Sequence, residues 1–142
     1  MKMTSDQLEN LVEIGNLERI NPSKMEFDTL VNRGECLLLD ARNESISIDG
    51  RFSLVYRAAH CLCTAALRWH GYKARGNRFS VFQVLTHTLE LTEEAVLLSD
   101  AHRRRNRMDY EGDPFDDQRF LESMIEAVQK VLDKIRLLDP IS

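Results

Sequence analysis

The chain has 142 residues and a mass of 16.4 kDa, a length that suits one domain with one hydrophobic core. It is 43% hydrophobic and 30% charged with only 6 Gly and 3 Pro, which excludes a collagen-like or low-complexity chain. No apolar run reaches the roughly 20 residues of a membrane span, and the start lacks the apolar core of a secretion signal. Three cysteines make no disulfide framework. We therefore expect a cytoplasmic protein with reduced thiols and no membrane association.

The net charge of -4 conceals a basic centre between two acidic ends. Residues 1–50 hold five bases and ten acids, residues 51–107 hold ten bases and four acids, and residues 108–142 hold four bases and nine acids. Most of the central cations are arginine, the side chain best suited to bidentate phosphate contacts. The alternative is that these arginines are scattered over solvated helix faces and merely balance the acids.

Hydrophobic residues recur with the helical period of 3.6 along most of the chain, and almost no stretch alternates as a strand would. A first, peripheral helix is predicted over residues 5–18, within an N-terminal segment of residues 1–20. Asn21-Pro22 ends it, and Ser23-Lys24-Met25-Glu26 has the spacing of a capping box. That box predicts a second helix that ends near Asn43.

Two glycine-containing segments divide the rest of the chain. A third helix is predicted after Asp49-Gly50, with Gly71 as its C-cap, and a long helical stretch follows from Phe79 to Glu111, kinked near Thr92. Gly112-Asp113-Pro114 interrupts it before a last helix over residues 116–138. Short loops between long amphipathic helices imply antiparallel neighbours. The sequence therefore predicts an all-α, up-and-down bundle of four to five helices, forming a single helical domain over residues 1–142.

The segment from Asp100 to Tyr110 breaks the amphipathic pattern. Each helical residue turns about 100°, so the stripe that is apolar in the first half of this helix becomes polar in the second. The residues near the angle of Arg105 on that stripe are His102, Asn106, Asp109 and Tyr110. Charged groups that face a core are costly unless they are paired or wetted. Either the helix end protrudes beyond the bundle, with Arg105–Asp109 as an i,i+4 ion pair, or it lines a polar pocket.

Arg105-Asn106-x-x-x-Tyr110, late in the penultimate helix, resembles the signature of HEPN domains. In that family four to six residues separate an Arg, often followed by Asn, from a His, and Tyr110 stands in the position of the His. The segments Tyr56-Arg57-Ala58-Ala59-His60 and Ala65 to Gly71 resemble the Ala-rich helix of the family and its glycine-terminated end. In outline the resemblance covers residues 23–138.

The resemblance implies a homodimer in which two such helices face a shared basic cleft directed at RNA. Many HEPN proteins are metal-independent endoribonucleases, often toxins paired with a nucleotidyltransferase-type antitoxin, in which the ribose 2′-OH attacks the adjacent phosphate. Arg105 would stabilise the developing charge, Asn106 would hold the phosphate or orient the motif, and Tyr110 or His102 would transfer protons. The remaining candidate binding residues are Arg103, Arg104, Arg107 and Asp109.

Two other interpretations stay open. The first is a non-catalytic HEPN-like module that binds RNA, a nucleotide or a partner protein through the same cleft, and the second is a helical scaffold without a ligand. His60-Cys61-Leu62-Cys63 resembles half of a metal site, but no second pair follows at ligand spacing. We interpret these cysteines as small buried thiols and expect neither a metal nor a cofactor.

Overall fold

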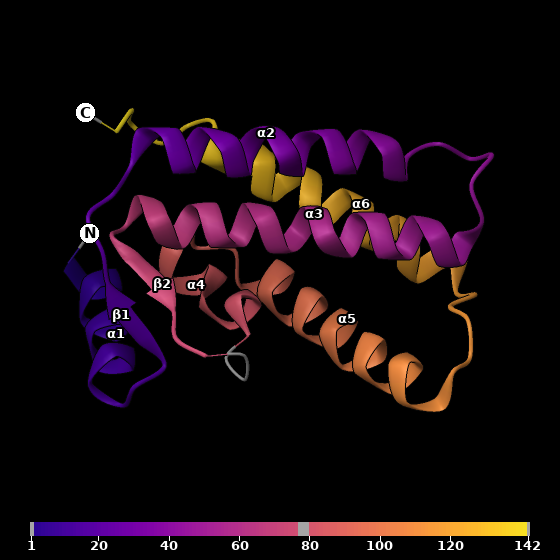
Figure 1. Ribbon diagram of the computed structural model, residues 1–142, viewed down its shortest axis with the longest axis horizontal. Coiled ribbons are helices and arrows are strands. Elements are labelled where there is room, and N and C mark those ends of the chain that lie inside the picture. Colours follow the sequence, from indigo (N-terminus) through magenta and orange to yellow (C-terminus); the bar gives the residue numbers. More distant parts are fainter. Residues whose placement is uncertain (1, 77–79, 142) are drawn as a thin grey trace.

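Long helices dominate the structure, a computed structural model that describes residues 2–76 and 80–141, with side chains from residue 6 onward. The four longest helices run alternately in opposite directions along the molecule (Figure 1). They are α2 (Lys24–Ala41), α3 (Ile48–Trp69), α5 (Thr92–Glu111) and α6 (Gln118–Ile135). The predicted all-α helical bundle is therefore confirmed.

The start of α2 follows the predicted capping signal. The Oγ of Ser23 accepts a hydrogen bond from the backbone N–H of Glu26 at 3.3 Å. The carboxylate of Glu26 does not return to Ser23 but receives Arg68 Nη1 at 2.8 Å from the last turn of α3. The cap thus also joins the start of α2 to the end of α3. Gly71 follows the C-cap of α3 with φ of +90°, as the sequence predicts for a helix-terminating glycine.

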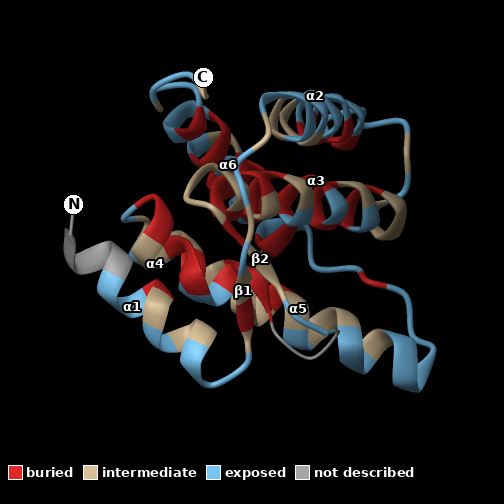
Figure 2. Cartoon of the chain, turned by 60° about the vertical axis from the view of Figure 1, so that its left-hand side comes forward, coloured by how far each residue is buried: buried red, intermediate tan, exposed pale blue. Residues whose placement is uncertain are grey.

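A close approach of α2 to α3 depends on Gly34. A Cβ atom at this position would lie 2.6 Å from Cδ2 of Leu62, which is fully buried in α3. The absence of a side chain therefore lets the two backbones approach each other at the centre of the bundle. The buried faces of α3 and α6 complete this core (Figure 2).

The N-terminal segment differs from its prediction. Helix α1 (Lys2–Glu13) ends at Glu13, and Gly15 takes φ of +87°. The chain then forms strand β1 (Leu17–Arg19), which pairs antiparallel with β2 (Tyr72–Ala74). The expected helix over residues 5–18 is therefore too long, because a left-handed glycine turns the chain. Strands of three residues are also too short to produce a visible alternation.

The predicted long helix from Phe79 to Glu111 is divided. Phe79 lies outside the described residues, and the chain next forms a 3-10 turn, η1 (Val81–Val84), and a short helix, α4 (Leu85–Thr88). Glu90 then takes φ of +61°, which no helix accommodates. The kink expected near Thr92 is thus a complete break, and α5 starts there in a new direction.

None of the helices in the described part of the chain combines the length and the apolar character needed to cross a membrane.

The packing at Gly34 yields a first prediction. We expect Gly34→Val to lower the free energy of unfolding by about 2 kcal/mol, because the new methyl groups overlap buried Leu62. The matched control is Cys36→Val, which places the same side chain on the exposed face of α2 and should change stability by less than about 0.5 kcal/mol. Urea unfolding followed by circular dichroism measures both. Equal losses in the two variants would contradict the proposed contact.

Candidate functional site

A pocket of about 460 Å³ lies among α2, α3, η1 and α5. Figure 1 shows α5 moving away from α3 toward its C-terminal end. Buried residues of α5 are confined to its first half, at Ala95, Leu98 and Ala101. The pocket is lined by Arg33, Tyr56, Arg57, His60, Cys61, Ser80, Val81, Phe82, His102 and Arg105. The polar half of α5 therefore faces a hollow just beyond the last buried turn of that helix.

The charge of this pocket is positive. Three guanidinium groups reach it from three different helices: Arg33 from α2, Arg57 from α3 and Arg105 from α5. No carboxylate is among the described lining residues, and within the described chain neither Arg33 nor Arg57 forms an ion pair. Arg105 has one carboxylate nearby, exposed Asp109, with Nε and Oδ2 3.8 Å apart. Such a pocket attracts anions.

His102 is held on both of its ring nitrogens. Its Nδ1 lies 2.7 Å from the hydroxyl oxygen of Tyr56, and its Nε2 lies 3.4 Å from Nδ2 of Asn106. These contacts fit a neutral tautomer in which Nδ1–H donates to Tyr56 and the lone pair of Nε2 accepts from Asn106. Burial, with Arg105 and Arg103 nearby, lowers the pKa of His102. Its imidazole is therefore neutral at neutral pH and can accept a proton.

The ring of Tyr56 also positions Arg105. The guanidinium carbon of Arg105 lies 4.5 Å from the centroid of the Tyr56 ring, a cation–π distance. The edge of Phe82 packs on the same ring at 5.5 Å between centroids. Burial raises the pKa of Tyr56 although Arg105 opposes the shift, so its hydroxyl stays protonated. One buried phenol thus fixes both His102 and Arg105.

A second imidazole and a thiol belong to the same pocket. His60 packs against Phe82 with ring centroids 6.3 Å apart. Burial lowers the pKa of His60, as do His102 and Arg105 to a smaller extent. Burial raises the pKa of Cys61, which outweighs the opposite effect of nearby Arg33. The thiol is therefore protonated and is no nucleophile at neutral pH.

The structure brings together only some of the residues that the sequence singled out. Arg105 and His102 line the pocket. Asn106 is not among the lining residues, but its Nδ2 contacts Nε2 of His102. Tyr110 is 92% exposed in the last turn of α5 and does not line the pocket. The sequence left two alternatives for the segment from Asp100 to Tyr110, a polar pocket or a protruding helix end. Both apply, since α5 lines a polar pocket at Arg105 and protrudes at Tyr110 and Asp109.

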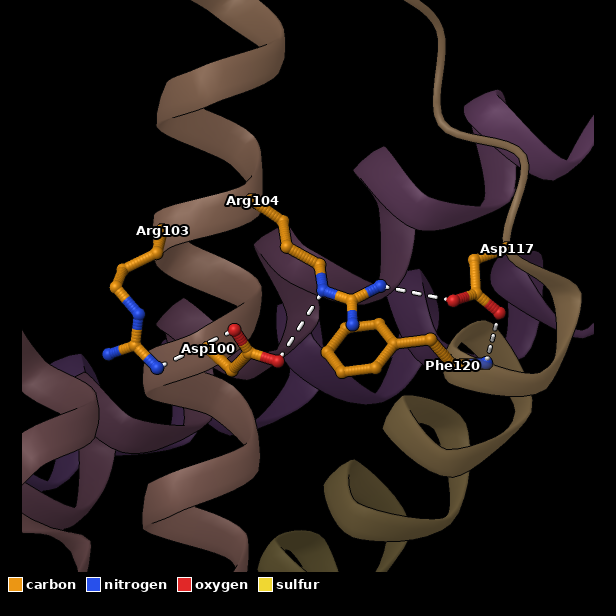
Figure 3. Close-up of polar contacts among 5 residues, drawn as sticks. All are labelled: Asp100, Arg103, Arg104, Asp117 and Phe120. Atoms are coloured by element: carbon orange, nitrogen blue, oxygen red, sulfur yellow. Dashed lines mark hydrogen bonds and ion pairs between the residues drawn. The ribbon is translucent and has the colours of Figure 1, made fainter.

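Arg104 points away from the pocket toward α6 (Figure 3). Its Nη1 lies 3.1 Å from Asp117 Oδ2, its Nε lies 3.4 Å from Asp100 Oδ2, and its guanidinium carbon lies 3.8 Å from the centroid of the Phe120 ring. Asp117 also caps α6 by accepting from the N–H of Phe120 at 3.0 Å. That backbone N–H and then Arg104 lower the pKa of Asp117. The structure therefore gives Arg104 a role in joining α5 to α6.

The two other arginines of the cluster lie on the surface. Arg103 is exposed and, among the residues that the structure describes, pairs only with Asp100, with Nη2 and Oδ1 3.5 Å apart. Arg107 is exposed and borders a shallow hollow of about 300 Å³ beside the segment of residues 113–117. Neither residue lines the basic pocket.

Sequence reasoning did not select eight of the described lining residues, and five of these lie on α2 and α3: Arg33, Tyr56, Arg57, His60 and Cys61. Four of them share α3, where Tyr56 and His60 stand at i and i+4 and so on one face of the helix. That spacing is a signal in the sequence for a shared role. Arg33 carries no comparable signal, because only the packing of α2 on α3 directs its side chain here.

Among residues 2–76 and 80–141, no group of three or more His, Cys, Asp or Glu side chains converges as a metal ion would require.

Comparison of the chain with protein-family models, with curated proteins and with solved structures finds no match. The HEPN resemblance therefore stays a prediction that rests on the sequence motif.

The opposite placements of neighbouring arginines yield a second prediction. We expect Arg104→Ala to lower the free energy of unfolding by about 1 kcal/mol, because it removes the cation–π contact with Phe120 and leaves Asp117 unpaired. The matched control, Arg103→Ala, loses only an exposed pair and should leave the thermal midpoint within error. Differential scanning calorimetry compares the two variants. A larger loss for Arg103→Ala would show that the placement is wrong.

A third prediction concerns pH. In the folded chain the pKa values of His60, His70 and His102 lie below the ordinary 6.5, with burial as the largest cause. As the pH falls through 6.5, the unfolded chain binds protons that the folded chain resists, so the free energy of unfolding decreases. We expect full stability above about pH 7 and a progressive loss from about pH 6.5 to 5, measured by urea unfolding.

The control for this pH effect is the double variant His60→Gln/His102→Gln. It should lose less stability across the same window, because two of the three groups no longer titrate. The pKa values of the Glu9 and Asp117 carboxyls are also lowered, to below 4.5. These two groups therefore take up protons only at a pH below the window of this experiment. A free energy of unfolding that stays constant from pH 7 to 5 would contradict the lowered pKa values of these imidazoles.

Proposed function

We propose that this protein binds RNA through the basic pocket and cleaves it without a metal ion. The single observation that carries the proposal is that Arg105 and His102 line one pocket, together with two further arginines and without a carboxylate among the described lining residues. The HEPN-like motif at Arg105-Asn106 supports the same assignment. RNA is the polyanion for which both the motif and the charge are suited.

The proposed reaction is attack of a ribose 2′-OH on the adjacent phosphate. The neutral Nε2 of His102 accepts the proton of the 2′-OH while the new O–P bond forms. Arg105 stabilises the negative charge that builds on the phosphate oxygens. The bond from phosphorus to the 5′ oxygen then breaks, the leaving oxygen takes a proton from water, and a 2′,3′-cyclic phosphate remains. In this scheme Tyr56 and Asn106 are positioning residues, since both act through His102.

A homodimer is part of this proposal. With about 100° per residue, Val96, Arg103, Arg107 and Tyr110 fall within roughly 60° of one another on the outer face of α5. Val96 is 65% exposed and Tyr110 is 92% exposed, so this face presents two large side chains to solvent. On the same wheel Arg105 lies about 180° from Val96, so in a dimer packed on this face each pocket would lie on the far side of its α5 from the interface. A nucleotidyltransferase-type antitoxin is the further partner that the resemblance implies.

The second candidate function is RNA binding without cleavage. One observation favours it: the side chain at the motif position of the family's His, Tyr110, lies outside the pocket. A phenol is also a weaker general base than the imidazole that the family motif has at this position. In this case the pocket would hold RNA, a nucleotide or a partner protein, and His102 would serve only as a hydrogen-bonding group.

A cleavage assay in EDTA tests the proposal and forms the fourth prediction. We expect the wild-type protein to cleave single-stranded or looped RNA, and Arg105→Ala and His102→Gln each to reduce the rate at least 100-fold. The control is Arg119→Ala, which removes an exposed arginine of α6 outside the pocket and should leave the rate within about twofold.

The other results of this assay separate the candidates. Salt-sensitive binding of RNA by every variant except Arg105→Ala, without cleavage, would support the non-catalytic module. Absence of salt-sensitive binding would overturn both. Sedimentation velocity at micromolar concentration tests the dimer, and a strict monomer there would contradict the shared surface on α5.

A further inference from the structure

The number of unpaired charges in the basic pocket points to a particular anion. Arg33 and Arg57 have no ion-pair partner within the described residues, and Arg105 has only the exposed carboxylate of Asp109 at 3.8 Å. Since His60 and His102 are neutral at neutral pH, the three guanidiniums provide the positive charge. An internal phosphodiester carries one negative charge, whereas a phosphate monoester carries about 1.5 to 2 at pH 7. Arg33 and Arg57 together therefore match a monoester better than an internal phosphate, whereas Arg105 beside His102 remains for the internal phosphate of the proposed reaction.

The aromatic rings of the pocket are closed to a nucleobase. Phe82 is 1% exposed and Tyr56 is 7% exposed. One face of the Tyr56 ring is covered by Arg105, and the edge of Phe82 packs on the ring as well. Recognition by stacking needs an accessible ring face, which neither side chain offers. Neither Phe82 nor Tyr56 is therefore available for stacking on a base, and the arginines are the recognition groups considered below.

The guanidiniums also converge from separate directions. Arg33 lies on α2, Arg57 on the middle of α3 and Arg105 on α5, so their side chains approach the hollow from three helices. A terminal phosphate has three free oxygens and can accept from both Arg33 and Arg57 while a third oxygen stays free, whereas an internal phosphodiester has only two. Ser80, which is buried at the start of η1, and the imidazole of His60 add neutral hydrogen-bonding groups to the lining.

We propose that Arg33 and Arg57 form a clamp for a terminal phosphate monoester in this pocket, beside the position of the internal phosphate at Arg105 and His102. The inference rests on the proposed function in that the monoester is taken to be the phosphorylated end of an RNA. A free nucleotide carries the same group, so the experiment includes both sources.

The experiment measures binding by fluorescence anisotropy to three versions of one labelled oligonucleotide, with a 5′-phosphate, with a 3′-phosphate or with hydroxyl ends only. All riboses are 2′-O-methylated, so that the blocked hydroxyls cannot attack and cleavage does not disturb the measurement. We expect one phosphorylated version to bind at least 10-fold more tightly than the hydroxyl version at 0.15 M salt. Arg33→Ala and Arg57→Ala should each reduce this preference to less than threefold.

The matched control is again Arg119→Ala, which should keep the full preference. Circular dichroism melting verifies that each variant is folded, and Arg33→Gln provides a second substitution that keeps the length of the side chain. Competition with adenosine monophosphate and with inorganic phosphate identifies the source of the monoester. Competition at micromolar concentration would assign the site to a free nucleotide or phosphate, and competition only at millimolar concentration would assign it to an RNA end.

Equal binding of the hydroxyl and phosphorylated oligonucleotides would overturn this inference and leave the proposed RNA-binding function standing. Binding of the mononucleotide without any binding of RNA would do the reverse, since the phosphate site would remain while the proposed function would fail. A preference that survives in both Arg33→Ala and Arg57→Ala would also overturn the inference, because the clamp would then lie elsewhere.

Discussion

The site depends on the side chain of Tyr56. Its hydroxyl lies 2.7 Å from Nδ1 of His102, and its ring lies under the guanidinium of Arg105. Phe52 and Phe82 pack against the Tyr56 ring in the core and hold it in place. A hydrogen bond from Nδ1–H of His102 to the oxygen of the buried phenol sets the tautomer of the imidazole, and a cation–π contact restricts a flexible arginine. The positions of His102 and Arg105 in the pocket therefore depend on the packing of α3 on η1.

The pocket exists because α5 leaves the core halfway along its length. Ala95, Leu98 and Ala101 are buried, and no residue of this helix beyond Ala101 is. The break at Glu90 makes this geometry accessible, since it lets α5 start in its own direction rather than continue from α4. Beyond Ala101 the polar side chains on the former core stripe face a hollow instead of a neighbouring helix. That arrangement avoids the desolvation cost that buried charges would carry.

Local signals in the sequence predicted the helices and one part of the site. The Ser23 cap, the glycine at 71 and the polar turn around Arg105 each express a preference of a few adjacent residues, and each is present in the structure. The pairing of β1 with β2 depends on two segments more than 50 residues apart, which periodicity does not reveal. Arg33 likewise reaches the site only through the packing of α2 on α3. Non-local contacts therefore account for what the sequence could not predict.

The densest run of arginines in the sequence is not the main source of the positive charge in the pocket. Of the dense run at 103–107, Arg104 is neutralised by Asp100 and Asp117, and Arg103 and Arg107 lie outside the pocket. The positive charge of the pocket comes from Arg105 together with Arg33 and Arg57, which are isolated in the sequence and belong to other helices. Neighbours on one helix diverge by about 100°, so a run of arginines spreads its charge over several faces. A pocket lined by one arginine from each of three helices concentrates positive charge, because the packing of the bundle brings together side chains that a single helix would direct to different faces.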